Sequence, residues 1–144
     1  MWLILSLAAA MLWGLNYVLV EHAVRRVSPF TVVWAELLVS LPLVYGAAMV
    51  SGRISPDIVT IQTDARAKTL VLASVATFLA ASICIVMAIS AKNATAAGLV
   101  EVSYPLFVAL FGWLIFREHH VTVGVIIGAV LIFAGIGVIA WSNR

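Results

Sequence analysis

A carboxylate stands inside an apolar run in the segment LVEVSYPLF, which extends from Leu99 to Phe107. In a helix, Glu101, Tyr104 and Val108 would share one face, so the phenol can point where the carboxylate points. Pro105 removes a backbone donor and can bend such a helix, which frees a carbonyl toward the same side. These groups could bind a proton or a cation.

Two earlier stretches offer groups of the same kind. Trp13 and Asn16 share a helix face by spacing, and so do Glu36 and Ser40, with Trp34 close to Glu36. Aromatic rings beside carboxylates suit organic cations or amphipathic, aromatic solutes through cation–π contacts. Trp34 fits a cavity wall or an interface anchor equally well.

The composition places these groups in a bilayer. Hydrophobic residues make up 65% of the 144 residues and charged residues only 10%, whereas a soluble domain carries about 25% charged residues. A net charge of +2 is too small to indicate nucleic acid as a partner. The single Cys84 excludes a disulfide or cysteine-based metal site within one chain. The sequence holds no phosphate-binding glycine loop, HExxH or nucleophile elbow, so an enzyme is not expected.

Five apolar segments reach the roughly 20 residues that a helix needs to cross a bilayer. They run about from Trp2 to His22, Phe30 to Val50, Thr69 to Ala91, Ala94 to Phe116 and Val121 to Trp141. The sequence therefore predicts an all-α membrane protein with one five-helix domain over residues 1–144. The long connection between the second and third segments is expected to hold a short interfacial turn.

The buried polar groups fall at a common depth. Glu101 lies roughly 10 Å along its segment and Glu36 roughly 9 Å, at 1.5 Å per residue, and Asn16 is similarly placed near the end of the first segment. By alternation, all three lie in the same leaflet. A charge at mid-membrane costs several kcal/mol and usually faces a cavity or a partner. Glu101 and Glu36 are therefore candidates to bind protons or a cationic substrate, with Tyr104, Asn16, Trp13 and Trp34 beside them.

Two stretches resemble a known family. MLWGLNYVLVEHAVRRVSPFTVVWAELLVSLPLV is similar to the opening of an EamA-type repeat of the drug/metabolite transporter superfamily, and VSYPLFVALFGWLIFREHHVTVGVIIGAVLIFAGIGVIA resembles the end of that repeat, including Glu118. Members commonly carry two inverted five-helix repeats around a central substrate cavity. The resemblance implies a secondary transporter, and the single repeat here implies that a second copy completes the cavity.

Loop charges and glycines bear on that assembly. Four Lys or Arg residues fall on each side of the membrane, so the positive-inside bias selects no orientation. Either Arg66 and Lys68 place the N-terminus inside, or the chain inserts both ways and forms an antiparallel homodimer. Gly128 and Gly135 indicate a dimer contact, whereas Gly124 fits packing within the chain as well. GAVLIFAGI also resembles the dimerising helix of the small multidrug resistance transporters.

The resulting expectation is a proton-coupled exchanger of small organic metabolites or drugs in the inner (plasma) membrane, working as a dimer with membrane lipids around it and no cofactor. The alternatives are a non-transporting assembly subunit and a flippase for polyprenyl-linked lipids. A metal is not expected, because Glu21, His22, Glu118, His119 and His120 lie at segment ends without further ligands at suitable spacing.

Overall fold

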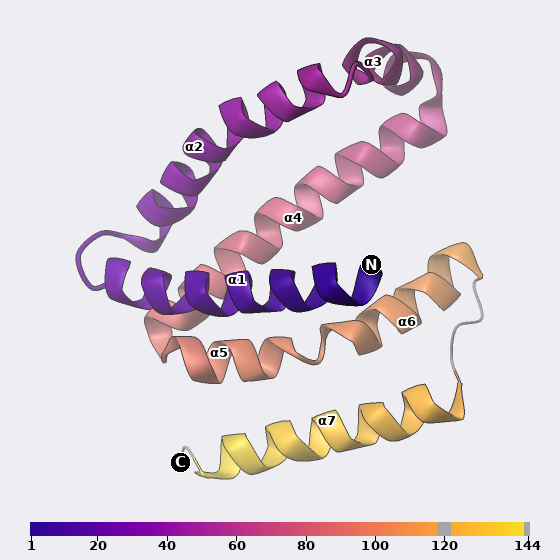
Figure 1. Cartoon of the computed structure of the whole chain (residues 1–144). Coiled ribbons are helices and arrows are strands. Elements are labelled where there is room, and N and C mark those ends of the chain that lie inside the picture. The colour runs from indigo at the N-terminus through magenta and orange to yellow at the C-terminus, as the bar shows by residue number, and fades with distance from the viewer. Residues whose placement is uncertain (118–121, 143–144) are drawn as a thin grey trace. The chain divides into compact units, whose positions relative to one another are not determined.

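The computed structural model describes residues 1–117 and 122–142. Within these ranges every regular element is a helix (Figure 1). The helices are α1 (Trp2–Ala23), α2 (Pro29–Val50), α3 (Ile54–Thr63), α4 (Ala65–Ala91), α5 (Ala94–Glu101), α6 (Tyr104–Phe116) and α7 (Val123–Ser142). The all-α fold class is therefore confirmed.

Each apolar segment predicted from the sequence contains at least one helix in the described residues. In the described part of the chain, four stretches are long and apolar enough to cross a membrane, and a shorter apolar helix follows them. The four are α1, α2, α4 and the stretch Ala94–Phe116 formed by α5 and α6, and the shorter one is Val123–Val138 of α7. Because lipid offers the backbone no hydrogen-bond partners, helices are the structures that these segments can form there.

The starts of α2 and α4 are set by polar side chains that accept from the first free N–H groups. Ser28 caps α2, its Oγ accepting from the Thr31 N–H at 3.2 Å, and Pro29 follows at the first helical position. Oδ1 of Asp64 accepts from the Arg66 and Ala67 N–H groups at 2.8 and 3.3 Å. This cap explains why α4 begins earlier than the predicted start at Thr69.

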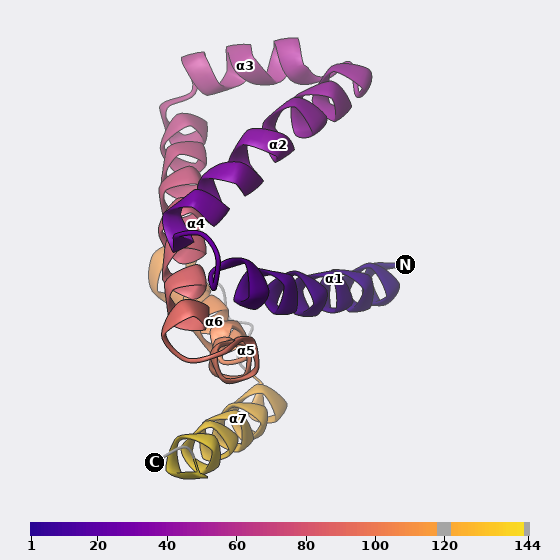
Figure 2. The same cartoon turned by 90° about the vertical axis from the view of Figure 1, so that its left-hand side faces the viewer.

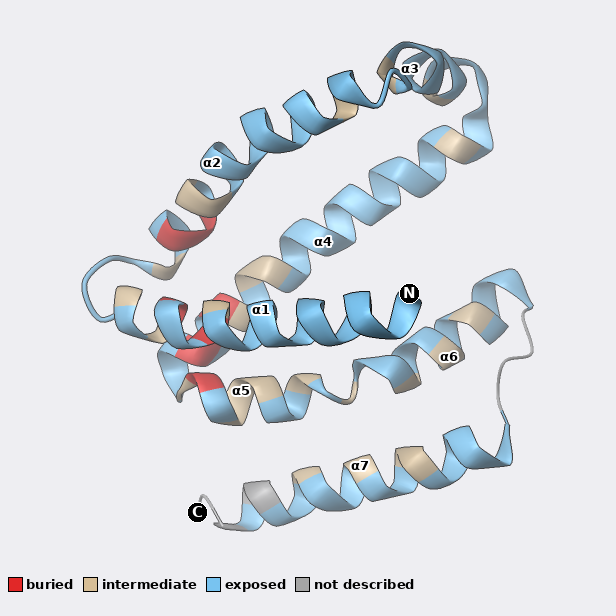
Figure 3. Ribbon diagram, in the orientation of Figure 1, coloured by how far each residue is buried: buried red, intermediate tan, exposed pale blue. Residues whose placement is uncertain are grey.

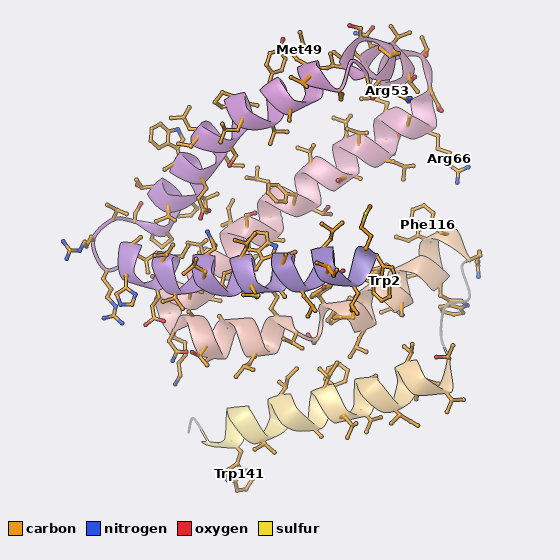
Figure 4. The ribbon with its side chains drawn as sticks, viewed as in Figure 1. Trp2, Met49, Arg53, Arg66, Phe116 and Trp141 are labelled. Atoms are coloured by element: carbon orange, nitrogen blue, oxygen red, sulfur yellow. The ribbon has the colours of Figure 1, made fainter. Side chains whose placement is uncertain are left out.

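The connection between α2 and α4 holds α3, a ten-residue helix where only a short interfacial turn was expected. Asp57 in its first turn lies 3.6 Å from Arg53, an ion pair at the favourable helix end. Figure 4 shows Arg53 and Arg66 at the two ends of this connection. The polar chemistry of these residues suits the headgroup region of a bilayer.

The segment Ala94–Phe116 differs from the prediction of one continuous helix. It is divided into α5 and α6 by Val102 and Ser103, whose N–H groups donate to the carbonyls of Gly98 and Val100 at 3.1 Å. Pro105 stands at the start of α6 and has no N–H to donate to the carbonyl of Glu101. The bend that the sequence predicts at Pro105 is seen as a turn at residues 102–103, just before the proline. At the other end of the chain, the expected helix start at Val121 lies outside the described residues, and α7 begins at Val123.

Replacing Pro105 by alanine is expected to join α5 and α6 into one helix, because alanine supplies the missing N–H and favours helix. Spin labels at Thr95 and Leu114, in a Cys84→Ala background, measure the change by their distance distribution. A continuous helix would separate these positions by roughly 28 Å along its axis. Pro42→Ala is the matched control, since α2 is already continuous through Pro42. An unchanged distribution in Pro105→Ala would show that the proline does not cause the turn.

The chain divides into two compact units. Unit 1 comprises Met1–Val18 with Lys92–Arg144, and unit 2 comprises Leu19–Ala91. In unit 2, α4 packs against α2 and α3, and Figure 2 shows α3 running between the far ends of α2 and α4. In unit 1, α5 and α7 are neighbours. A single five-helix domain stays a prediction.

Few side chains are buried. In unit 2 these are Val20, Val32, Val33, Val86 and Ile89, and in unit 1 Tyr17 and Ala94, among the described residues. Figure 3 shows most of every helix except α5 as exposed, and α5 is mostly half-buried. Trp2 and Trp141 are 75% and 80% exposed. Exposed apolar helix faces are the expected surface of a protein in contact with lipid or with other helices.

Candidate functional site

Two helices of unit 1 position the groups of the candidate site. On α1, Trp13 and Tyr17 are one helical turn apart, and their ring centroids lie 5.8 Å from each other at a tilt of 58°. On α5, Gly98 and Glu101 also share a face by spacing. Asn93 fixes the start of α5, because its Oδ1 accepts from the Ala96 N–H at 2.7 Å.

These helices border a cavity of about 800 Å³, large enough for a small organic molecule. Its wall is mainly apolar, with a few hydroxyls and one carboxylate, and no Lys, Arg or His is among the described residues that line it. The lining consists of Ser6, Ala9, Ala10, Trp13, Gly14, Tyr17, Val18, Ala94, Thr95, Gly98, Leu99, Glu101, Val102 and Tyr104. A pocket of this kind binds an apolar or aromatic body and offers a single anionic group to orient it.

The carboxylate of Glu101 is held by α1. The Tyr17 hydroxyl donates a hydrogen bond to Oε2 of Glu101, across 84 positions of the sequence. Tyr17 is only 9% exposed, and a Cβ at Gly98 would lie 3.4 Å from Cδ2 of its ring. The phenol ring therefore lies against α5 at Gly98, where there is room for a Cβ but not for a long side chain.

Three of the residues expected from the sequence line this cavity: Glu101, Trp13 and Tyr104. Tyr104 is 62% exposed and begins α6, just past the turn that follows Glu101. Asn16 is half-buried on α1, and the described cavity wall does not include it. Glu101, Trp13 and Tyr104 thus lie about one cavity in unit 1.

Glu36 and Trp34 lie on α2 and belong to unit 2. Glu36 is half-buried, and Trp34 is largely exposed. The expected pairing of Glu36 with Ser40 takes a different form, since the Ser40 hydroxyl donates to the backbone carbonyl of Glu36 at 2.6 Å. This is a common local bond of a serine inside a helix. The roles of Glu36 and Trp34 in binding stay predictions.

The glycines of α7 have open space around them. A Cβ at Gly128 or Gly135 would meet no atom within 4 Å in the described structure, and one at Gly124 would lie 3.7 Å from Oγ1 of Thr122. Another helix can approach closely where side chains are missing. The dimer contact through Gly128, Gly135 and Gly124 stays a prediction.

Acidic and histidine side chains outside the cavity form no metal site in the described residues. Glu21 pairs with Arg25 at 2.8 Å, one helical turn away on the same helix. Glu118, His119 and His120 lie outside the described residues.

Tyr17 is the site residue that the sequence interpretation missed. Its spacing to Trp13 was a usable signal, since residues four apart on a helix are neighbours. The carboxylate in another segment was the second signal, because a buried acid requires hydrogen-bond donors.

Long apolar helices, two of which border a cavity with one carboxylate, define an integral membrane protein of the polytopic helical class. The model of the EamA-like transporter family matches residues 1–141, and the chain belongs to this family. No curated protein and no solved structure is significantly similar to it. The chain is accordingly a membrane transporter of the drug/metabolite superfamily, whose EamA members are generally not enzymes.

Proposed function

We propose that this transporter exchanges protons for small organic cations or amphipathic aromatic solutes by alternating access. The observation that carries the proposal is the position of Glu101 in a mainly apolar cavity of about 800 Å³. A proton and a cationic substrate would compete for this carboxylate, so release of one favours binding of the other. Trp13 and Tyr104 supply aromatic surface for cation–π contact or stacking.

The place of an acidic residue within a predicted membrane-spanning segment supports the role of Glu101. Acidic residues in transmembrane helices are costly and commonly mark ion or proton pathways. The described residues of the cavity wall include no basic side chain that would repel a cation. Glu101 is the acidic residue among them that would attract it. The hydroxyl of Tyr17 compensates part of the cost by its hydrogen bond to Oε2.

The proposed assembly is an antiparallel homodimer in the inner (plasma) membrane. The family model matches residues 1–141, for which we propose one five-helix repeat, whereas the family resemblance implies two inverted repeats around a shared cavity. Balanced loop charges and the open faces at Gly128 and Gly135 support a second copy as the source of the other repeat. Each copy would contribute one Glu101 and one Glu36.

Flux measurements in proteoliposomes test the proposed function. The purified protein is supplied with organic cations, zwitterionic metabolites, nucleosides and a polyprenyl-linked sugar, each with and without a pH gradient. We expect a gradient-dependent flux of aromatic monocations that saturates. Flux that ignores the gradient would refute proton exchange, and movement of the polyprenyl-linked sugar alone would favour a flippase instead.

A further inference from the structure

Two tyrosines line the same cavity as Glu101, and they differ in environment. Tyr104 is close in sequence but 62% exposed, whereas Tyr17 is 9% exposed and comes from another helix. The Tyr17 hydroxyl donates to Oε2 of Glu101. The partner of the carboxylate is thus a residue of α1 and not its neighbour across the turn.

The ring of Tyr17 is fixed by the atoms around it. On one side lies the backbone of α5 at Gly98, where an added Cβ would be only 3.4 Å from Cδ2. Trp13 packs on the same helix face with a centroid separation of 5.8 Å. A phenol with few alternative positions offers its hydroxyl at one place, which is the condition for orienting a carboxylate through one bond.

We infer that Tyr17 is the positioning residue of Glu101. The ring of Tyr17 lies against Gly98, and its hydroxyl holds one carboxylate oxygen so that the other oxygen can receive the substrate. The inference rests on the proposed function, because it assigns how the substrate-binding carboxylate is presented. A charge-assisted hydrogen bond is stronger than a neutral one, so an ionised Glu101 holds α1 against the end of α5 more firmly than a neutralised one.

Infrared difference spectroscopy tests the contact without any substrate. The band of Glu101 is identified as the one that disappears in Glu101→Gln, and Tyr17→Phe removes only the hydroxyl that donates to it. We expect Tyr17→Phe to shift this band, and Tyr104→Phe and Tyr45→Phe to leave it in place. Tyr45 on α2 supplies the same substitution outside the cavity. A band unmoved by Tyr17→Phe, or moved equally by Tyr104→Phe, overturns the inference.

Uptake of benzyltrimethylammonium, an aromatic monocation, separates positioning from a structural role. We expect Tyr17→Phe to raise the half-saturating concentration roughly tenfold, as for loss of one hydrogen bond to a charged group, with little change in maximal rate. A merely structural defect would instead lower the amount of active protein and the maximal rate. That outcome, or unchanged kinetics, contradicts a positioning role.

Gly98 provides a second pair of variants that keeps the phenol intact. Alanine fits there, since 3.4 Å is ordinary contact, whereas the longer side chain of leucine would displace the ring of Tyr17. Gly98→Leu should therefore shift the Glu101 band, and Gly98→Ala should not. An identical band in both variants would show that Gly98 does not seat the ring.

The two proposals fail in different ways. If the unaltered protein does not transport benzyltrimethylammonium, the proposed substrate class is wrong, and the infrared comparison still decides whether Tyr17 holds Glu101. If transport occurs and the band is unaffected by Tyr17→Phe, the proposed function stands and the positioning role is wrong.

Discussion

Glu101→Gln is expected to abolish pH-gradient-driven uptake of aromatic monocations and to leave the protein folded. Glutamine has nearly the same shape but cannot exchange a proton or carry a charge, so the competition between proton and substrate is lost. Its amide oxygen can still accept from the Tyr17 hydroxyl, which preserves the contact between α1 and α5. Uptake into proteoliposomes measures the loss, and far-ultraviolet circular dichroism with size-exclusion chromatography checks the fold.

Asp57→Asn makes the same chemical change outside the cavity. Asp57 lies in α3 and pairs with Arg53, and its exposed ion pair contributes little to stability. Uptake in this control should match that of the unaltered protein. If Glu101→Gln retains gradient-driven uptake, Glu101 is not the coupling group, and Glu36 on α2 becomes the first candidate for that role.

Two added lysines near α3 are expected to bias the chain toward one orientation and to reduce transport strongly. In the predicted five-helix topology, four Lys or Arg residues fall on each side and give no net positive-inside bias, so a small addition should decide the orientation. Val59→Lys with Gln62→Lys changes exposed positions of α3. If an antiparallel pair is the active form, a population with a single orientation lacks half of each dimer.

Co-expression with an oppositely biased variant should restore transport. Val27→Lys with Ala91→Lys adds the same charge at exposed positions of the other side. Labelling of single cysteines in a Cys84→Ala background, together with C-terminal reporter fusions, measures the orientations directly. If the unmodified chain places its C-terminal reporter on only one side, the antiparallel homodimer is wrong, and a parallel copy or another repeat completes the cavity.

Local pattern predicted the helical spans because hydropathy and length constrain a chain in lipid so strongly. The apolar runs beginning at Trp2, Phe30 and Ala94 coincide within a residue with the starts of α1, α2 and α5. Where a polar capping residue determines the start of a helix, hydropathy alone does not predict that start. Asp64 caps α4, which begins at Ala65, four residues before the predicted start at Thr69.

Local sequence pattern predicted the contacts of the candidate site less well than it predicted the helices. Helical spacing predicted that Tyr104 lies beside Glu101, because residues three apart share a face in a continuous helix. The turn at Val102 and Ser103 interrupts that helix, and the phenol that reaches Glu101 comes from α1. A contact between residues 17 and 101 depends on how two helices pack, which spacing along either helix does not determine.

The turn between α5 and α6 has a consequence for hydration. Pro105 leaves the carbonyl of Glu101 without its usual donor, and within a membrane-spanning segment an unsatisfied carbonyl costs several kcal/mol. Irregular backbone is tolerated in a membrane where it is buried in protein or faces water. Glu101 and Val102 line the cavity, so a water molecule there could donate a hydrogen bond to the carbonyl of Glu101. We therefore expect water to occupy this cavity when no substrate is bound, and a substrate that enters would have to replace the hydrogen bonds of the water that it displaces.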